Sequence, residues 1–370
     1  VVEGENRCEV ATFRSDGRYV DGRRPEEVRY GGPEEDARRR DFTVNGLFLD
    51  VATGEVIDFV GGRADLEARV IRCIGRPEDR FAEDKLRLLR CVRLAGEFGF
   101  RIEERTWEAC VRMAGQIKAV SAERIRDELT KILTAPRAGD GLDLLLRSGL
   151  LREILPECAA LRGCPQPDRW HQEGDVFEHT RLMLNLMEKP GPVLAWAALL
   201  HDVGKPITLV HHADGRPGNP GHEKESQRIA CEALRRLRFS NAIIEQVCEC
   251  VLHHMQFKDV RAMRLATLKR MLARPTFETE LELHRLDCLA SHRKLDNYEF
   301  LKERQSALSR EEIKPKPLVT GHDLMNLGFK PGPDLGRILK EIAEAQLDGR
   351  IATREEALEM ARQVLDGAGQ

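Results

Sequence analysis

The spacing of apolar residues changes along this chain, from short runs near the N-terminus to the wider repeat that is typical of helices. From about Glu83 onward apolar positions recur every three or four residues, and Leu88, Val92 and Ala95 fall on one helical face in this way. Ser121 is a favourable N-cap for a helix that runs to about Leu133. The pattern therefore predicts a chain that is helical almost to its end.

Residues 1–72 show a different pattern, in which short apolar runs alternate with turn residues. The segments 9–13 and 42–50 are predicted strands, and Gly54 turns the chain into a further strand at 56–58. The predicted fold class is therefore α+β, with a β-rich N-terminal part followed by predominantly α-helical parts.

Proline-rich stretches divide the helical part of the chain. Cys164-Pro-Gln-Pro167 separates a helical segment at 73–160 from a second at 168–310, which a loop at 214–221 interrupts. Lys314-Pro-Lys-Pro317 leads into a C-terminal unit at 316–370, whose last helix opens with the capping box Thr353-Arg-Glu-Glu356. Four parts are thus predicted, with boundaries near residues 72, 160 and 310.

Composition narrows the possible partners and compartments. With 41% hydrophobic and 33% charged residues but a net charge of only −3, any binding of nucleic acid must rest on local basic faces. Aromatic residues make up 5% of the chain, which argues against base stacking as the main mode of binding. Ten cysteines without paired CxxC motifs suit a reducing compartment, and no apolar run reaches the length of a membrane span. We therefore expect a cytoplasmic protein that does not contact membranes.

The sequence Glu83-Asp84-Lys85-Leu86-Arg87 carries a candidate for base recognition. On one helix, Glu83, Asp84 and Arg87 share a face and present carboxylate acceptors beside a forked donor. Cytosine and adenine both place an amino donor next to a ring-nitrogen acceptor, whereas uracil and guanine carry a carbonyl there. Such a protein surface can accept C and A and refuse U and G. The alternative is an ordinary salt bridge on a helix surface.

A basic run precedes the predicted strand at 42–50. Arg38, Arg39 and Arg40 suit a triphosphate, and Asp41 and Asn45 are placed to bind ribose hydroxyls. The alternative for the arginine run is a solvated basic turn.

Several motifs together resemble class II CCA-adding and related A-adding tRNA nucleotidyltransferases, of the poly(A) polymerase family. They occur in the family's order and spacing, and they are Glu9 to Arg14, Tyr19 to Pro25, Arg39 to Asn45, Asp58 to Gly62, Arg80 to Arg87, and Ser121-Ala-Glu-Arg124. The resemblance covers essentially the whole chain. It implies a polymerase-β-like nucleotidyltransferase head over 1–72, a helical neck over 73–160, an HD domain over 168–310 and a tRNA-holding tail over 316–370.

The resemblance also implies roles for individual residues. The implied nucleotide-binding set is Arg39, Arg40, Asp41, Asn45, Glu83, Asp84, Arg87 and Arg90. Within it Glu83, Asp84 and Arg87 read the base. Glu9 is a possible auxiliary carboxylate, although a strand residue facing solvent is the simpler interpretation. The implied partners are tRNA, ATP and CTP, and whether CCA, CC or A alone is added stays open.

One departure from the family pattern concerns metal chemistry. The family's head carries an Asp-x-Asp pair that binds two Mg²⁺ ions, and the first forty residues here already match the segment that follows this pair. We therefore expect a truncated chain that is inactive in polymerisation, with Mg²⁺ as the cofactor of the intact head.

A second constellation resembles the metal site of HD domains. Its predicted ligands are His179, His201, Asp202 and Asp287, with His222 and His254 as further ligands for a second ion. Imidazoles with carboxylates suit Mn²⁺, Fe²⁺, Ni²⁺ or Mg²⁺ and can serve phosphoester hydrolysis. Two alternative functions remain open, namely a metal-dependent HD phosphohydrolase and a tRNA-binding remnant without catalysis.

Overall fold

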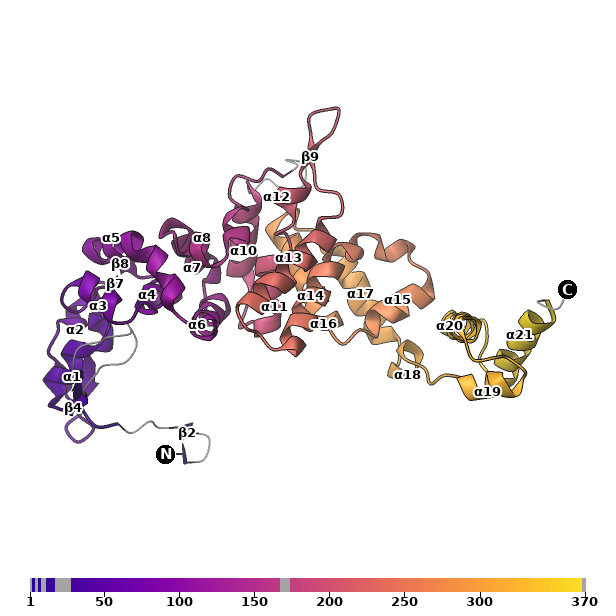
Figure 1. Cartoon of the computed structure of the whole chain (residues 1–370), viewed down its shortest axis with the longest axis horizontal. Helices are drawn as coiled ribbons and strands as arrows, with labels where there is room; N and C mark the ends of the chain where they lie inside the picture. The colour runs from indigo at the N-terminus through magenta and orange to yellow at the C-terminus, as the bar shows by residue number, and fades with distance from the viewer. Residues whose placement is uncertain (1, 4–5, 8–10, 17–27, 167–173, 368–370) are drawn as a thin grey trace. The chain divides into compact units, whose positions relative to one another are not determined.

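The computed structural model describes residues 2–3, 6–7, 11–16, 28–166 and 174–367 (Figure 1). Within them the chain forms two compact units, one of residues up to Leu252 together with Leu289–Arg293, the other of His253–Cys288 and Lys294 onward. No helix of the described residues is long and apolar enough to cross a membrane.

The first unit begins with short strands and continues as helices. Its strands are β1 (Val2–Glu3), β2 (Asn6–Arg7), β3 (Arg14–Asp16), β4 (Val28–Tyr30), β5 (Leu47–Leu49), β6 (Val56–Asp58), β7 (Val70–Ile71), β8 (Arg101–Ile102), β9 (Val210–His211) and β10 (Pro217–Gly218). Its helices are α1 (Pro33–Arg39), η1 (Thr43–Asn45), α2 (Gly62–Glu67), α3 (Pro77–Glu83), α4 (Arg87–Phe98), α5 (Glu104–Met113), η2 (Ala114–Ala119), α6 (Ala122–Thr134), α7 (Ala138–Arg147), α8 (Leu150–Ile154), α9 (Pro156–Ala159), α10 (Val176–Leu186), α11 (Pro192–Leu200), α12 (Lys205–Thr208), α13 (His222–Arg236) and α14 (Asn241–His253).

The second unit is helical and contains two separate hydrophobic cores. Its elements are η3 (His254–Ala262), α15 (Leu265–Leu272), α16 (Phe277–Ala290), α17 (Asp296–Ala307), α18 (Arg310–Ile313), α19 (Gly321–Asn326), α20 (Pro333–Leu347) and α21 (Arg354–Gly367). One core surrounds Phe257 and Phe277, and the other surrounds Ile338 and Ile342. The predicted capping box is confirmed, because Thr353 and Glu356 exchange side-chain to backbone hydrogen bonds at the start of α21.

The strands pair only two by two, as β1–β2, β3–β4, β5–β6, β7–β8 and β9–β10. All are antiparallel except β7 with β8, where Val70 lies opposite Arg101 and Ile71 opposite Ile102. The strand predicted at 56–58 is confirmed as β6, and the interrupting loop at 214–221 lies at the β9–β10 hairpin. The α+β fold class is also confirmed, with helix predominating.

Two predicted strands differ from the structure. Residues 8–10, and with them Glu9, lie outside the described residues, and 11–13 are irregular before β3 begins at Arg14. In the segment 42–50, Phe42 forms an isolated bridge with Cys73 and the chain then turns through η1 before β5 begins at Leu47. A tertiary contact explains the turn, because the Thr43 hydroxyl donates to the buried Asp65 carboxylate at 2.7 Å.

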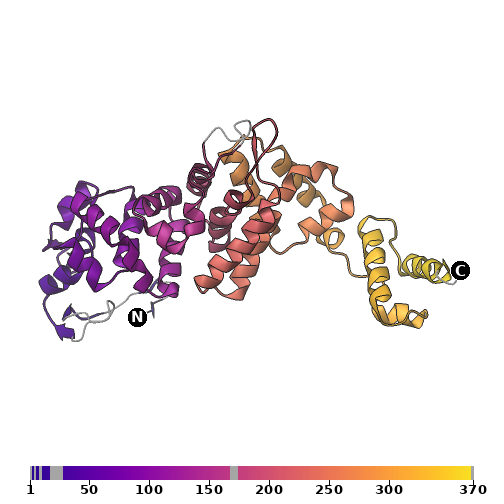
Figure 2. The same ribbon diagram turned by 45° about the horizontal axis from the view of Figure 1, so that its top comes forward.

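The helices of the neck segment pack around α4. Its buried face carries Leu88, Leu89 and Val92, and α6 and α7 lie against it, with α10 on the other side of α7 (Figures 1 and 2). Helix α6 begins after the predicted N-cap Ser121 and ends before Ala135. Gly96 of α4 faces Gly141 of α7 so closely that a Cβ on Gly96 would lie 2.9 Å from the Gly141 Cα. This packing fixes the face of α4 that carries the site described below.

The cysteines lie almost entirely in the interior. Seven of the described cysteines are buried and lie outside the disulfide that Cys231 of α13 forms with Cys248 of α14. Burial raises the pKa of Cys73 and Cys110 to about 12, so both stay protonated at neutral pH. The scattered cysteine pattern predicts a reducing compartment, where disulfides are rare, so it does not predict the Cys231–Cys248 bond.

Candidate functional site

A cavity of about 510 Å³ opens within the first unit and brings together segments that are far apart in the sequence. Its walls come from the turn after α1, the junction of α3 and α4, the face of α4 and the first turn of α6. The lining residues are Arg39, Arg40, Asp41, Asn45, Asp84, Leu86, Arg87, Arg90, Arg93, Leu94 and Arg124. Seven of the eight residues predicted for nucleotide binding are among them, and the eighth, Glu83, contacts Arg87 from behind the wall.

The charge of this wall is strongly positive. Six arginines and two aspartates line the cavity, which leaves a net charge of four positive units on its surface. Guanidinium groups bind phosphate oxygens through paired hydrogen bonds and stay charged at every physiological pH. The cavity is therefore chemically suited to a polyphosphate group.

The turn that carries Arg39 and Arg40 is held by arginines of the neck. Arg87 donates from Nη2 to the Arg39 carbonyl oxygen at 3.1 Å, and Arg80 donates to the Arg38 carbonyl at 3.4 Å. Arg40 donates to the Asn45 carbonyl at 2.7 Å and lies over the Phe48 ring, 4.5 Å from its centroid. These contacts give the backbone of the turn one defined course along the cavity.

Asp41 and Asn45 lie side by side in the wall. The Asn45 amide donates to Asp41 Oδ1 at 2.9 Å, and Arg90 reaches Asp41 Oδ2 at 2.6 Å from one turn into α4. Asp41 is buried, so this pair of contacts also satisfies its charge. Arg90 is thereby positioned at the cavity.

The segment 83–87 corrects one sequence-based prediction. It does not lie on a single helix: α3 ends at Glu83, Asp84 is extended with φ −143° and ψ 106°, and α4 begins at Arg87. The Asp84 carboxylate accepts the Leu86 N–H at 3.1 Å, and this local bond competes with helix continuation. The predicted alternative is also present, since Arg87 Nη1 lies 2.6 Å from Glu83 Oε2.

Because the helix ends between them, the side chains of Glu83 and Asp84 have different partners. Glu83 binds Arg80 and Arg87 in the wall, whereas Asp84 faces the cavity and accepts two hydrogen bonds from Arg124 of α6, at 2.7 and 3.1 Å. An ionised carboxylate offers about four lone-pair positions, so Asp84 can accept a further donor while it stays bound to Arg124. Arg87 uses three of its five N–H donors on Glu83, Arg80 and Arg39, as far as hydrogen bonds to described residues go.

Sequence reasoning missed two arginines of this cavity. Arg124 was quoted within a motif but given no role, and Arg93 was not singled out. Arg93 lies one turn beyond Arg90 on α4 and binds the buried Glu128 of α6 at 2.6 Å. For Arg124 the available signal is its spacing of four residues from Glu128, which places both on one face of α6, and for Arg93 it is the spacing of three residues from Arg90 on α4.

A glycine-containing turn behind the cavity supports the η1 turn. Asp58 accepts four backbone N–H groups at the start of α2, from residues 60 to 63. Although burial alone would raise the pKa of Asp58, these hydrogen bonds lower it below its usual value. Gly62 approaches the η1 turn so closely that a Cβ there would lie 2.1 Å from the Thr43 carbonyl oxygen. Glycine is therefore required at this position for a packing reason.

A second cluster in the first unit joins three of the predicted metal ligands. His179 of α10, His201 at the end of α11, and Asp202 are all buried, and their ligand atoms lie within 4.8 Å of one another. His201 Nε2 lies 3.1 Å from Asp202 Oδ2, and His222 Nε2 lies 3.3 Å from Asp202 Oδ1. The structure thus gathers His179, His201, Asp202 and His222 in one place.

Backbone contacts orient two of these imidazoles. His201 Nδ1 lies 2.9 Å from the Ala198 carbonyl oxygen, and His222 Nδ1 lies 2.8 Å from the Asn219 carbonyl oxygen. A carbonyl can only accept, so Nδ1 carries a proton in both rings and Nε2 is the ring nitrogen that faces Asp202. Two imidazole nitrogens and a carboxylate are a donor set that fits a first-row divalent metal.

The charge on Asp202 is well supported. Burial would raise its pKa, but the charges of His201 and Lys205 and hydrogen bonds from the histidines hold it well below the usual value. Lys205 Nζ lies 2.6 Å from Asp202 Oδ2 and also donates to Gln166. The remaining predicted ligands belong to the second unit, where His254 is buried at the start of η3 and Asp287 is half-buried in α16. Their approach to the other ligands stays a prediction.

Comparisons with known proteins identify the family of this chain. Family models match at residues 1–72, described as the poly A polymerase head domain, at 99–161, described as a probable RNA and SrmB-binding site of polymerase A, and at 224–361, described as a putative tRNA nucleotidyltransferase domain 2. The A-adding tRNA nucleotidyltransferase of Deinococcus radiodurans is 33% identical over 88% of this chain and 77% of its own length. The CC-adding enzyme of Thermus thermophilus is 36% identical over 88% and 76%, and the CCA-adding enzyme of Streptococcus thermophilus is 33% identical over 97% and 79%.

The chain belongs to the CCA-adding tRNA nucleotidyltransferase family. Its fold is that of the CCA-adding enzyme of Bacillus stearothermophilus, solved in complex with CTP, with a TM-score of 0.69 and 24% identity over 97% of this chain and 79% of that one. The CCA-adding enzyme of Thermotoga maritima, solved in complex with tRNA, matches with a TM-score of 0.52 and 21% identity over 90% and 74%.

The family depends on divalent metal ions, so the carboxylates of the cavity can be compared with the paired-carboxylate site that binds such ions. The chain contains no Asp-x-Asp sequence, and the two aspartates of the cavity wall, Asp41 and Asp84, are each bound by an arginine. These residues therefore do not fit the paired-carboxylate site for two Mg²⁺ ions. What the cavity supplies is a cationic, hydrogen-bonding surface.

Proposed function

We propose that this chain binds the incoming nucleotide and selects its base in the addition of C or A to the 3′ end of tRNA. The observation that carries the proposal is the arginine-lined cavity that gathers the family's nucleotide-binding residues from three separate segments. ATP and CTP are the proposed nucleotides, and tRNA is the proposed partner.

Each part of the cavity has a proposed task. Arg39 and Arg40 bind the triphosphate, whose charge matches the positive wall. Asp41 and Asn45 bind the ribose hydroxyls. Because their side chains already share a hydrogen bond, they hold acceptor and donor groups in fixed positions for the sugar.

Base selection is assigned to Asp84 and Arg87. Asp84 accepts the exocyclic amino group of cytosine or adenine, and Arg87 donates to the neighbouring ring nitrogen. Uracil and guanine would set a carbonyl against the Asp84 carboxylate, leaving two acceptors without a hydrogen between them. Glu83 holds Arg87 in place from the wall. Relatives that add A, CC and CCA are similarly close to this chain, so the proposal names C and A without ranking them.

The test is a comparison of nucleotide affinities for the full chain. We expect isothermal titration calorimetry to show binding of CTP and ATP that is at least about tenfold tighter than that of UTP and GTP, which corresponds to about 1–3 kcal/mol for one good base contact. Arg87→Ala should remove the preference.

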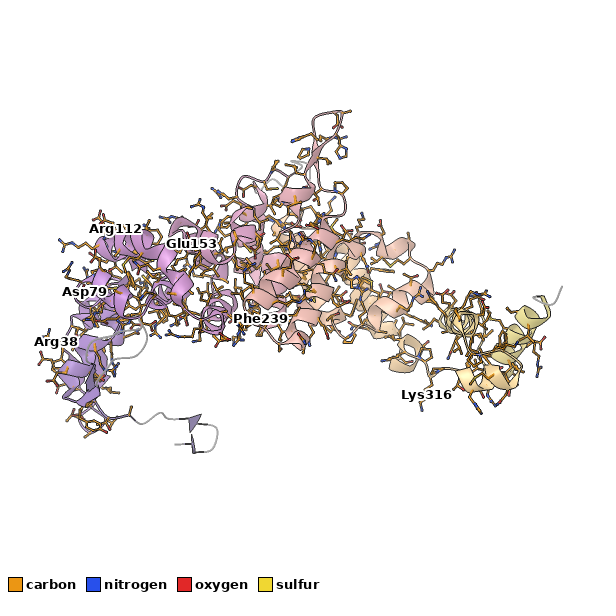
Figure 3. All side chains as sticks on the ribbon, viewed as in Figure 1. Arg38, Asp79, Arg112, Glu153, Phe239 and Lys316 are labelled. Atoms are coloured by element: carbon orange, nitrogen blue, oxygen red, sulfur yellow. A yellow bond between two sulfur atoms is a disulfide. The ribbon has the colours of Figure 1, made fainter. Side chains whose placement is uncertain are left out.

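A matched control is Arg112→Ala. Arg112 of α5, labelled in Figure 3, forms a 2.6 Å salt bridge with Glu78 of α3. It does not line the cavity. Equal affinities for all four nucleotides in the unaltered chain would refute the proposal, and so would an Arg87→Ala chain that keeps full discrimination. A gel-shift assay with tRNA that lacks its CCA end tests the proposed partner separately.

A second function is favoured by the buried His179–His201–Asp202 cluster. We propose that it holds a divalent ion, with Mn²⁺, Fe²⁺, Ni²⁺ and Mg²⁺ as candidates and His222 beside it, and that it supports hydrolysis of small phosphoesters. The ion would supply Lewis acidity, while the carbonyls of Ala198 and Asn219 keep the histidine nitrogens aimed at it.

Metal content decides this second proposal. Elemental analysis after dialysis against Mn²⁺ or Ni²⁺ should find bound metal in the unaltered chain and little in a His201→Ala variant. A chain that binds neither metal would refute the site, whereas bound metal without hydrolysis of a 2′,3′-cyclic nucleotide to its 2′- or 3′-monophosphate would leave it a structural ion. The proposed compartment for both functions is the cytoplasm.

A further inference from the structure

One buried carboxylate stands directly behind the cavity without lining it. Asp36 of α1 is only 3% exposed, and both of its oxygens face arginines of the following turn. Oδ1 accepts from Arg39 Nε at 2.9 Å, and Oδ2 accepts from Arg40 Nε at 3.1 Å and Nη2 at 3.0 Å. A single side chain therefore binds both arginines that are assigned to the triphosphate.

The spacing along the chain explains how one residue reaches two. Arg39 and Arg40 are three and four residues after Asp36, the two separations that bring side chains together on a helix surface. Helix α1 ends at Arg39, and Arg40 is already extended with φ −68° and ψ 169°. Without a shared partner, the two guanidinium groups would diverge at this helix end.

The remaining contacts show why the shared partner matters. Arg40 is also tied to the Asn45 carbonyl and the Phe48 ring, so its guanidinium plane is fixed from both sides. About a quarter of the Arg39 side chain and a third of the Arg40 side chain stay exposed to the cavity. An arginine side chain has many rotamers, so a partner that fixes it beforehand reduces the entropy that is lost when a ligand binds.

We propose that Asp36 is a positioning residue for the nucleotide's triphosphate, acting through Arg39 and Arg40. The proposal rests on the nucleotide-binding function proposed above and extends it to a residue that touches no ligand. Simple electrostatics makes the opposite prediction, because removing a negative charge behind a cationic wall should strengthen the binding of an anion. The sign of the effect therefore separates positioning from bulk charge.

The experiment compares Asp36→Asn with Glu34→Gln in the full chain. Glu34 lies on the same helix and pairs with Arg38 at 2.7 Å, but both side chains are more than half exposed and neither lines the cavity. CTP and inorganic tripolyphosphate serve as probes in calorimetric titrations. We expect Asp36→Asn to weaken the affinity for both probes about tenfold, which is the size of the effect of one charge-assisted hydrogen bond. Glu34→Gln should leave both affinities unchanged.

Two further measurements keep the outcome clear. Asp36→Glu retains the charge and should recover part of the lost affinity, and it decides the question if Asp36→Asn does not fold by circular dichroism. Unchanged or tighter binding of tripolyphosphate by the folded Asp36 variants overturns the inference. If the unaltered chain binds tripolyphosphate in an Asp36-dependent way but shows no preference for CTP over UTP, the base-selection proposal fails while the positioning role stands.

Discussion

Replacing Arg124 tests whether base selection depends on a residue that does not itself read the base. Arg124 binds Asp84 through two hydrogen bonds of 2.7 and 3.1 Å, and about a quarter of the Arg124 side chain and a fifth of the Asp84 side chain are exposed. We choose Arg124→Met, which keeps the length and much of the apolar volume of the side chain but removes every donor. Asp84 then loses the partner that fixes the direction of its carboxylate.

The size of the effect follows from the geometry. Fully exposed ion pairs contribute about 0.2–1 kcal/mol, and loss of one partner from a fully buried pair costs about 3–5 kcal/mol. A bidentate pair that is mostly but not fully buried falls between them, at roughly 1.5 kcal/mol, or about a tenfold change in affinity. We expect CTP to bind about tenfold more weakly, with a smaller change for UTP, so that the preference for C falls.

The assay is a double-mutant cycle on the affinities for CTP and UTP, with Asp84→Asn as the second change. If Arg124 acts through Asp84, the two substitutions together should cost little more than Asp84→Asn alone. Arg112→Met, in a more exposed arginine–carboxylate pair outside the cavity, is the control. Additive effects, or an Arg124→Met chain with tighter CTP binding and full selectivity, would refute the reasoning.

Three further predictions follow from other contacts. Gly62→Ala should destabilise the first unit by about 1–3 kcal/mol in urea unfolding, because the added Cβ would meet a backbone carbonyl at 2.1 Å, whereas Gly115→Ala, with no atom within 4 Å, should be nearly neutral. Burial favours a raised pKa for Asp36, but the hydrogen bonds of its two arginines lower it. Its stabilisation is therefore present above the ordinary value of 3.8 and lost as the pH falls below it, and urea titrations from pH 6 to 3 should show a smaller acid loss in Asp36→Asn. Binding of Mn²⁺ should weaken as the pH falls, because protons compete with the metal for the imidazole nitrogens, and His201→Ala should abolish it while His211→Ala, at an exposed residue, should not.

The sequence predicted most of the cavity because its chemistry is concentrated in short motifs. Residues 39–45 are contiguous and residues 83–87 form one short motif, so the local pattern was enough to propose them. The family resemblance added Arg90, which lies one turn beyond Arg87 on α4. The start of α6 after Ser121 and the capping box at Thr353 were predictable for the same reason, since each of these helix-start signals spans no more than four consecutive residues.

What the sequence did not predict depends on contacts between distant segments. Asp84 leaves the helix, although the 83–87 pattern is compatible with one, because its side chain bonds to the Leu86 N–H and to Arg124, which lies forty residues away. The η1 turn replaces the first half of a predicted strand because Thr43 bonds to Asp65 across twenty-two residues. Neither partner can be assigned from spacing alone, since nothing local indicates which distant side chain will face it.

The paired arrangement of charges explains how so many arginines can share one cavity. Like charges at these distances repel, and each arginine of the wall is paired with a carboxylate, one of which serves two arginines. The pairs are Arg39 and Arg40 with Asp36, Arg87 with Glu83, Arg90 with Asp41, Arg93 with Glu128, and Arg124 with Asp84. Two of these carboxylates lie in the wall, while Asp36, Glu83 and Glu128 lie behind it, so the surface that a ligand meets stays cationic although the whole cluster is nearly balanced. The side chains of such a site are ordered before the nucleotide binds. Selection between bases then depends on hydrogen-bonding groups whose positions are already fixed.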